Sequence, residues 1–378
     1  MSKLNHILIL DPIAFAGGSK VSTKHVLSQL KSKEARVTIL TADPKSWKQS
    51  QAYVQPLCMP EKLEKAEQGL SYFARHLFIA LQLLWLRLFV GKIDTALAAS
   101  GPGVDLALYL IKPLFGFKLI QMIHGPVARS RTIGRCLKTA DNVFYLSSAQ
   151  HSLEHALEAA GYSSDICSYT NFQTFKNGLP KNSWPSPCQY DYSVVFWAAS
   201  LLKWKGLDVL LRAIRGMRPS MRPETHICYI KPQQNNLPVS EAPQPINKVF
   251  WHHAPENLDH IRASANVFIS TSTKEPFGLS ILEAMAAGMC IIIPSDGAFW
   301  DQQLTDGVNC IKYTPDDENA LTKAIVKAQS DMTMVKSMGK SVASIAQSYR
   351  AEICFSAICS ALMSEQTSVL DNISGERA

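Results

Sequence analysis

Short apolar runs alternate with longer helix-forming stretches along the chain. Each apolar run is bounded by turn residues, which predicts a buried strand. In the first half these runs fall at residues 6–10, 36–41, 93–99, 117–123 and 141–147; in the second half they fall at 192–198, 226–231, 248–252, 267–270 and 290–294. The stretches between them predict helices that end near Leu30, Ala160 and Met217, with others at 70–90, after Gly278 and at 342–363. Strands that alternate with helices predict an α/β protein with parallel sheets.

The chain divides into two such halves. Residues 176–190 contain three prolines, one glycine and two asparagines, which is the composition of a linker. A length of 378 residues also suits two domains better than one. We therefore expect an N-terminal domain at 1–180 and a C-terminal domain at 190–344.

Composition narrows the classes of protein and partner. Hydrophobic residues make up 47% and charged residues 18%, which excludes wholesale disorder. A net charge of +7 favours anionic partners such as nucleotides or phospholipid head groups. Basic and aromatic residues form no concentrated stripe, so we expect no nucleic acid partner.

Cysteine usage indicates a reducing compartment. Nine cysteines are scattered without a C-x-x-C pair, so neither a disulfide framework nor a zinc site is predicted. The pair His252-His253 has no further ligand at convincing spacing, and we expect no metal. The apolar run 7–10 is too short for a signal peptide, so we expect a cytoplasmic protein.

Residues 70–90 form the most hydrophobic part of the chain. A transmembrane helix needs roughly 20 mainly apolar residues, but Arg75, His76, Gln82 and Arg87 interrupt this stretch. Two interpretations stay open: a helix partly buried in the core, and an amphipathic helix that contacts an anionic membrane peripherally at its cytosolic face.

Residues 272–288 carry the strongest candidate chemistry. Gly278 lies in the turn between a strand and a helix, where a ligand can approach the backbone closely. The N–H groups near Gly278, Leu279 and Ser280 would then bind phosphate at the positive end of the helix. Glu275 and Glu283 are suited to accept hydrogen bonds from sugar hydroxyls. An ordinary turn between strand and helix is the alternative.

Other candidates also follow strands, where doubly wound sheets bind ligands. Gly17 and Gly18 come after the first strand, although from the residues alone a plain tight turn is the preferred explanation. His124 ends the strand at 117–123. Lys203 and Lys205 follow the strand at 192–198 and could hold phosphate by charge, or lie solvated in a loop.

The segment E-P-F-G-L-x-x-x-E-A-M-A-A-G resembles the donor-site motif of the retaining glycosyl transferases of group 1, family 4. In that family, as here, seven residues separate the two glutamates. The resemblance implies a GT-B fold, in which two Rossmann-like domains face each other across a cleft and a terminal helix, here about 345–365, returns to the first domain. It also implies sugar transfer from a nucleotide-diphosphate donor, without a metal or other cofactor.

The resemblance also implies roles for single residues. Glu275 would position the transferred sugar, Glu283 would bind the ribose, and Lys205 would neutralise the leaving diphosphate. His124 matches a histidine that contacts the donor sugar region. The Gly17-Gly18 turn resembles the loop that approaches the donor phosphate from the first domain, and Asn171 resembles an asparagine at the end of a strand before the crossover.

Ser200 departs from the family pattern. It stands where the family has a diphosphate-binding arginine, in G-R-L-x-x-x-K-G. Either Lys203 compensates, or the donor is held differently, or activity is weak. The resulting expectation is transfer to a glycan or lipid-linked glycan in cell-surface polysaccharide or lipopolysaccharide synthesis. A nucleotide-sugar epimerase and a non-catalytic nucleotide-binding subunit remain alternatives.

Overall fold

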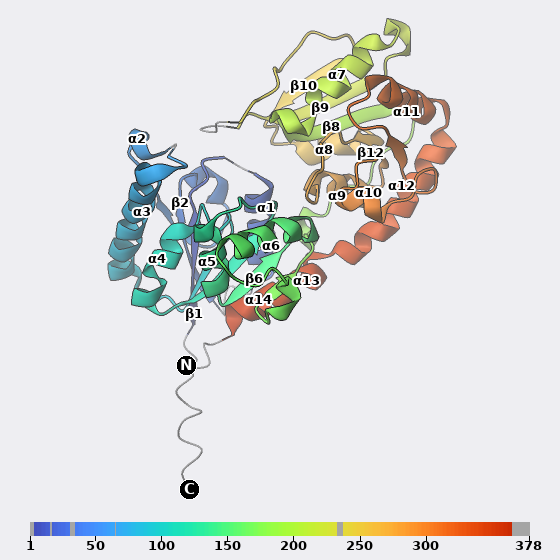
Figure 1. Cartoon of the computed structure of the whole chain (residues 1–378). Helices are drawn as coiled ribbons and strands as arrows, with labels where there is room; N and C mark the ends of the chain where they lie inside the picture. The colour runs from blue at the N-terminus through green and yellow to red at the C-terminus, as the bar shows by residue number, and fades with distance from the viewer. Residues whose placement is uncertain (1–3, 16, 31–34, 65, 233–236, 365–378) are drawn as a thin grey trace. The chain divides into compact units, whose positions relative to one another are not determined.

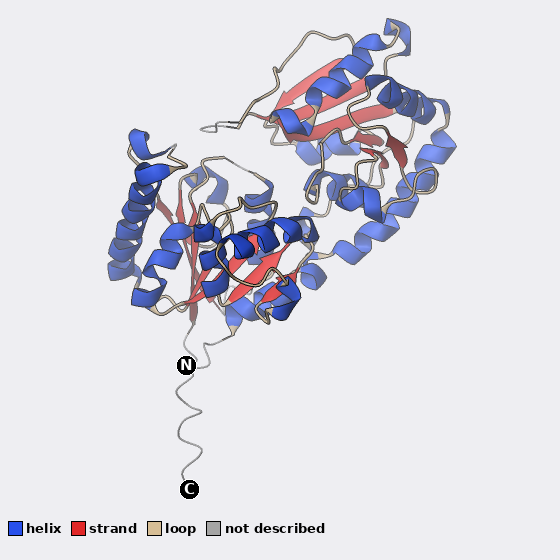
Figure 2. Ribbon diagram, in the orientation of Figure 1, coloured by secondary structure: helices blue, strands red, loops and turns tan. Residues whose placement is uncertain are grey.

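The computed structural model describes residues 4–15, 17–30, 35–64, 66–232 and 237–364, and the chain forms two compact units (Figure 1). The first unit comprises the described residues within 1–14, 26–175 and 356–378. The second comprises those within 15–25 and 176–355. Each unit has a parallel sheet with helices packed on it (Figure 2).

The sheet of the first unit has the strand order β3-β2-β1-β4-β5-β6-β7, and neighbouring strands pair in parallel. The strand bounds are β1 (Asn5–Asp11), β2 (Ala35–Thr41), β3 (Tyr53–Pro56), β4 (Thr95–Ala98), β5 (Lys118–Ile123), β6 (Asn142–Tyr145) and β7 (Phe172–Thr174). The helices in this part of the chain are α1 (Gly18–Leu27), α2 (Glu61–Glu64), α3 (Gly69–Val90), α4 (Leu106–Phe115), α5 (Arg131–Thr139) and α6 (Gln150–Ala159).

A single apolar core joins helices α3 to α6 to one face of this sheet. Its members include Leu83 of α3, Leu108 of α4, Leu137 of α5 and Leu153 of α6, all fully buried. The strands contribute every second residue to this core, for example Leu8 and Leu10 of β1, because neighbouring strand residues point to opposite faces.

The sheet of the second unit has the order β10-β9-β8-β11-β12-β13, again with parallel pairs. The strand bounds are β8 (Val194–Ser200), β9 (Glu224–Ile230), β10 (Val249–His253), β11 (Val267–Ile269), β12 (Cys290–Pro294) and β13 (Ile311–Tyr313). The helices are α7 (Leu207–Gly216), α8 (Leu258–Ala263), α9 (Leu279–Ala286), α10 (Phe299–Gln303), α11 (Glu318–Ser330), α12 (Met332–Ala346) and α13 (Ala351–Cys354).

In both sheets the strand order reverses beside the first strand of the unit. The reversal falls between β1 and β4 in the first sheet and between β8 and β11 in the second. Loops that leave the carboxyl ends of such strands diverge and leave room for a ligand. The predicted doubly wound α/β architecture is confirmed.

The helix predicted over 342–363 is wrong as a single element. Helix α12 ends at Ala346, a 3-10 turn follows at Gln347–Tyr349, and the extended backbone of Arg350 (φ −69°, ψ 138°) separates it from α13. A further helix, α14 (Ser356–Met363), lies in the first unit. There its carbonyls accept hydrogen bonds from the first residues of three strands, Asn5, Thr95 and Lys118.

Within the second unit, the two chain segments that lead to the first unit are paired. The Leu179 N–H donates to the Tyr349 carbonyl (2.9 Å), and the Ala351 N–H donates to the Leu179 carbonyl (3.0 Å). The guanidinium of Arg350 also lies 3.7 Å from the ring centre of Trp184. The crossover at 176–179 is therefore fixed to the segment 349–351.

Candidate functional site

The loops after β8 and β11 meet where the second sheet reverses its strand order. The Lys205 carbonyl accepts a hydrogen bond from Thr271 Oγ1 (2.9 Å), and the Trp204 carbonyl accepts one from the Thr273 N–H (2.9 Å). Gly206 follows with φ +72°, and a Cβ there would lie 2.0 Å from the Thr271 carbonyl oxygen. Only glycine allows the two loops to approach this closely.

This contact brings Lys205 and Glu275 together. The Lys205 ammonium lies 2.5 Å from Glu275 Oε2, and both side chains are largely buried, with 18% and 15% of their surface exposed. The ammonium also lies 4.0 Å from the ring centre of Trp204, in cation–π distance. An ammonium has three N–H donors, so Lys205 can bind Glu275 and still donate to a phosphate.

Lys203 points to a different partner. Its ammonium lies 2.8 Å from Asp208 Oδ2, which also accepts a hydrogen bond from Ser240 Oγ (2.8 Å). Burial raises the pKa of Asp208, but the bonds from Lys203 and Ser240 outweigh it, so the pKa lies below its ordinary value. A groove of about 450 Å³ begins beside Lys203 and Gly206.

The loop between Glu275 and α9 is anchored by aromatic packing. Phe277 is buried, with its ring centre 4.8 Å from that of Phe299, 5.3 Å from Trp300 and 6.1 Å from Tyr349. The Trp300 indole N–H also donates to the Gly278 carbonyl (3.3 Å). This anchor fixes where helix α9 begins.

Gly278 is the N-cap of α9 and has a left-handed backbone (φ +79°). The next residues, Leu279 and Ser280, form the first turn, where helix geometry provides no intrahelical acceptor for the N–H groups. They therefore present the positive end of the helix, as the sequence predicts for a phosphate site.

Glu283 lies on the second turn of α9 and is paired with a buried cation. Arg262 of α8 donates to Glu283 Oε2 (2.7 Å) and to Asp259 Oδ1 (3.1 Å), and Asp259 in turn accepts from Ser186. Burial raises the pKa of Glu283, while Arg262 opposes that shift. No local pattern in the sequence indicates Arg262, because it precedes Glu283 by 21 positions on another helix.

His124 is the candidate in the first unit. It follows β5, and its ring packs edge-on against Phe175 with 5.5 Å between ring centres. Both ring nitrogens are buried and have no hydrogen-bond partner within the described ranges. Burial lowers the pKa of His124 to about 4, so the ring is neutral at pH 7 and can donate or accept.

The prediction that Asn171 ends a strand is wrong. Asn171 precedes β7, and its side chain donates to the Ala140 carbonyl (2.9 Å). The asparagine that follows β7 is Asn177, which is buried and accepts a hydrogen bond from Ser22 Oγ (2.6 Å). Strand β7 has only three residues, so its position was not evident from periodicity.

The Gly17-Gly18 pair leads into helix α1. Gly18 is the first residue of the helix, and the Gly17 carbonyl accepts from the Val21 N–H (3.1 Å). One turn further on, Ser22 bonds to Asn177 and His25 Nδ1 lies 3.1 Å from the Gly178 carbonyl. The middle and later part of α1 are thereby joined to the crossover within the second unit.

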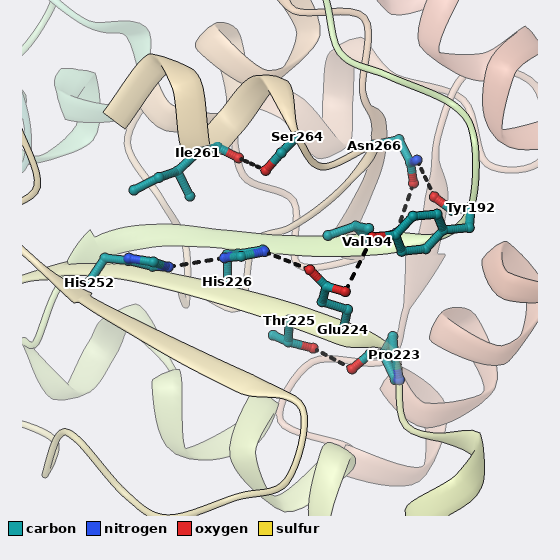
Figure 3. A network of polar contacts seen from close by, with 10 residues as sticks. All are labelled: Tyr192, Val194, Pro223, Glu224, Thr225, His226, His252, Ile261, Ser264 and Asn266. Atoms are coloured by element: carbon teal, nitrogen blue, oxygen red, sulfur yellow. Dashed lines mark hydrogen bonds and ion pairs between the residues drawn. The ribbon is translucent and has the colours of Figure 1, made fainter. Parts of the chain in front are cut away.

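A polar network of histidines lies on β9 and β10 (Figure 3). His226 Nε2 lies 3.1 Å from Glu224 Oε1, and His226 Nδ1 lies 3.0 Å from His252 Nε2. The adjacent His253 instead stacks on Tyr229, with 5.1 Å between ring centres. Neighbouring strand residues point to opposite faces, so His252 and His253 do not converge. No group of three or more metal-ligating side chains occurs in the part of the chain that the structure describes.

The second unit matches a known protein family. Residues 181–344 match the family model for glycosyl transferases group 1. The second unit therefore carries a glycosyl transferases group 1 domain, and the enzyme class is that of the glycosyltransferases. No curated protein matches the sequence.

Among solved structures, the chain is similar to HepE of Anabaena in complex with UDP and glucose, at 17% identity and a TM-score of 0.70, over 95% of this chain and 99% of HepE. It is similar to sucrose-phosphate synthase of Thermosynechococcus elongatus, at 17% identity and a TM-score of 0.67, over 94% and 96%. It is also similar to the lipopolysaccharide outer core galactosyltransferase WaaB, at 15% identity and a TM-score of 0.63, over 95% and 100%. The predicted GT-B fold is confirmed.

Proposed function

We propose that the protein is a retaining, metal-independent glycosyltransferase that moves a sugar from a nucleoside diphosphate donor to a glycan or lipid-linked glycan acceptor. The observation that carries the proposal is the Lys205–Glu275 pair, held 2.5 Å apart beside the start of α9. Similarity to WaaB favours an acceptor of cell-surface polysaccharide or lipopolysaccharide synthesis.

The chemistry follows from the charges of the site. As the bond from the sugar to the diphosphate breaks, negative charge develops on the departing phosphate. The Lys205 ammonium and the N–H groups of Leu279 and Ser280 stabilise that charge. Glu275 then accepts hydrogen bonds from the hydroxyls of the transferred sugar, and Glu283 from the ribose. The leaving phosphate takes the proton of the acceptor hydroxyl, and the acceptor oxygen bonds to the anomeric carbon on the face from which the diphosphate departs. The configuration is thereby retained without a carboxylate as covalent nucleophile.

His124 of the first unit and the Gly17-Gly18 turn are further candidates for contact with a sugar and a phosphate, each taken by itself. The two unpartnered ring nitrogens of His124 suit a sugar hydroxyl, because a neutral imidazole has one donor and one acceptor. Ser200 ends β8 without a charge, and Lys203 is paired with Asp208. If Lys203 takes the place of the family arginine, it exchanges Asp208 for phosphate when the donor binds.

The first experiment is titration calorimetry of UDP, GDP, ADP and CDP against the purified protein. UDP comes first because the structures of HepE hold UDP. We expect one nucleotide to bind selectively, and Glu283→Ala to weaken that binding about tenfold or more, since hydrogen bonds to charged groups contribute roughly 1.5–3 kcal/mol. The exposed Glu352, replaced by alanine, is the matched control. Folded protein that binds none of the four would contradict the proposal.

A second experiment separates transfer from the alternatives. Incubation of the selected nucleotide sugar without any acceptor gives an epimerised sugar if the protein is an epimerase, and no such product if it is a transferase. The uncharged Ser200 favours a non-catalytic nucleotide-binding subunit as second candidate. That candidate requires nucleotide binding without turnover over a panel of glycan and lipid-linked acceptors, and Ser200→Arg then tests whether the missing guanidinium is the cause.

A further inference from the structure

Helix α3 has apolar residues on both of its long faces. One face, with Ile79, Leu83 and Leu86, is buried in the core of the first unit. On the other face, every exposed residue after Ser71 is apolar. These residues are Phe73, Ala74, Leu77, Leu81, Trp85, Leu88 and Phe89. Trp85 is 61% exposed and Leu88 79%. Core packing therefore explains one face of this helix and leaves the outer face unexplained.

Helix α4 extends this outer face. Leu110 and Leu114 are 50% and 70% exposed, one turn apart on α4, which packs beside α3 (Figure 1). Arg87 joins the two helices, because its guanidinium lies 4.5 Å from the ring centre of Phe115 and donates to the Phe115 carbonyl (3.4 Å). We call the exposed apolar residues of α3 together with Leu110 and Leu114 the α3–α4 apolar surface. Exposed patches of this kind mark interaction sites.

The charges around the surface indicate its partner. Residues 69–118 contain five lysines and arginines and two aspartates: Arg75, Arg87, Lys92, Lys112 and Lys118, with Asp94 and Asp105. Asp105 is fully buried, Asp94 is paired with Lys92 at 3.6 Å, and Lys112 is paired with Asp141 at 2.7 Å, so the net positive charge of this region rests on Arg75, Arg87 and Lys118. An apolar face bordered by cations is complementary to a bilayer with anionic head groups.

The aromatic residues also suit a bilayer. Trp85 and Phe89 pack together, with 4.4 Å between ring centres, and Arg87 lies between them in sequence. Tryptophan and arginine are favoured at the boundary of acyl chains and head groups, where their apolar parts are buried and their polar ends stay hydrated. Acidic residues, Glu61, Glu64 and Glu67, lie just before α3, so the end with Trp85 and Phe89 is better suited to insertion.

Whether helix α3 crosses a membrane is a separate question from whether it binds to one. Helix α3 is long and apolar enough to cross a membrane by length and composition, the sole helix with these properties in the described ranges. However, 33% of its most apolar 18-residue window is buried inside the unit. A helix that contributes one face to a folded core can lie along a membrane surface without leaving that core.

We propose that the α3–α4 apolar surface binds an anionic bilayer, with the axis of α3 parallel to the membrane plane and Trp85, Leu88 and Phe89 inserted among the acyl chains. At about 1.5 Å per residue, the exposed residues from Phe73 to Phe89 then contact the lipid over roughly 24 Å. The inference deepens the proposed function, since it places the enzyme at the cytosolic membrane face where a lipid-linked acceptor is found, but membrane binding itself does not require turnover.

The test is flotation of the full chain with vesicles of phosphatidylcholine and phosphatidylglycerol, beside vesicles of phosphatidylcholine alone. The variant replaces Trp85, Leu88 and Phe89 by serine. The matched control replaces three residues of similar exposure in the second unit, Leu237, Val308 and Ile353, by serine. Circular dichroism shows that each variant is folded, and nucleotide calorimetry reports the donor site separately.

We expect wild type and control to float with the anionic vesicles, and the Trp85/Leu88/Phe89 variant to bind them about tenfold or more weakly with unchanged nucleotide affinity. Binding should also fall when salt is raised or when phosphatidylglycerol is omitted.

Equal binding of variant and wild type would overturn the proposal, and so would wild-type protein that does not bind anionic vesicles. If the substitutions instead convert a dimer into a monomer on size exclusion without changing flotation, the surface binds a second copy of the chain and the bilayer assignment is wrong. Loss of nucleotide binding in wild type with intact flotation would contradict only the proposed function.

Discussion

Replacement of Gly206 by alanine tests whether the close approach of the two site loops matters. Gly206 has φ +72°, and its added Cβ would lie 2.0 Å from the Thr271 carbonyl oxygen. An ordinary contact needs about 3.4 Å, so one of the loops must move by roughly 1.4 Å. Lys205 adjoins one of these loops and Glu275 belongs to the other, so the movement separates the pair or rotates it.

Gly307 supplies a matched control. It has nearly the same backbone, with φ +71°, and nothing lies within 4 Å of a Cβ placed there. Gly307→Ala should therefore show only the penalty of a left-handed backbone, about 1–2 kcal/mol. Gly206→Ala should show that penalty and a further 1–3 kcal/mol for overpacking.

The assay combines unfolding in urea with nucleotide calorimetry on both variants. We expect Gly206→Ala to be less stable than Gly307→Ala by about 1–3 kcal/mol. We also expect it to bind the selected nucleotide about tenfold or more weakly, since a shift of site side chains by about 1 Å greatly weakens the interactions of a preorganised site. Gly307→Ala should bind as wild type does. Equal stability and equal affinity of the two variants would refute the argument that Gly206 is required for loop contact.

Three further predictions concern charged groups. Removal of either member of the Arg262–Glu283 pair, by Arg262→Met or Glu283→Met, should lower the free energy of unfolding by about 3–5 kcal/mol. The double variant should lose less than the sum of the two single losses. Strict additivity of the three losses, measured by unfolding in urea, would contradict the pairing. Burial raises the pKa of Asp105 to about 7, so the native state holds an extra proton between about pH 4 and 7, and its stability falls as pH rises through that window. Asp105→Asn should remove this fall, which amounts to a difference of up to roughly 4 kcal/mol above pH 7. Parallel curves of unfolding free energy against pH for variant and wild type would contradict this prediction. Lys205→Met should weaken nucleotide binding about tenfold to a hundredfold, because it removes a cation from the phosphate site and leaves Glu275 unpaired; unchanged affinity in calorimetry would remove Lys205 from the site.

The long elements of the fold were predictable because their periodicity extends over many residues. Strand β1, helix α3 and the strand-turn-helix unit around Gly278 lie within a few residues of the predicted positions. Strands β3, β7 and β13 were missed because each has only three or four residues and includes a polar one, whereas the equally short β11 is wholly apolar. Without a continuous apolar run, a period of two residues cannot be established over so short a segment.

The candidate site was only partly predictable for a related reason. The motif placed Glu275 and Lys205 in the same region, and the structure brings them into contact. Pairs that depend on packing between distant segments left no signal in the sequence. Arg262 reaches Glu283 from another helix, and Phe277 is held by residues up to 72 positions away at Tyr349. Such contacts are decided by the tertiary arrangement and not by local spacing.

The anchoring of Phe277 has a thermodynamic consequence for regulation. Tyr349 packs in the same aromatic cluster as Phe277, and its carbonyl accepts the hydrogen bond from Leu179 at the crossover. Displacement of the donor loop and displacement of the crossover therefore share one set of contacts. A donor that favours one position of Phe277 biases the conformation of the crossover, and by reciprocity any constraint on the crossover changes donor affinity by the same factor. A ligand that never touches the donor site, but binds at 176–179 or 349–351, would then act as an effector of this enzyme.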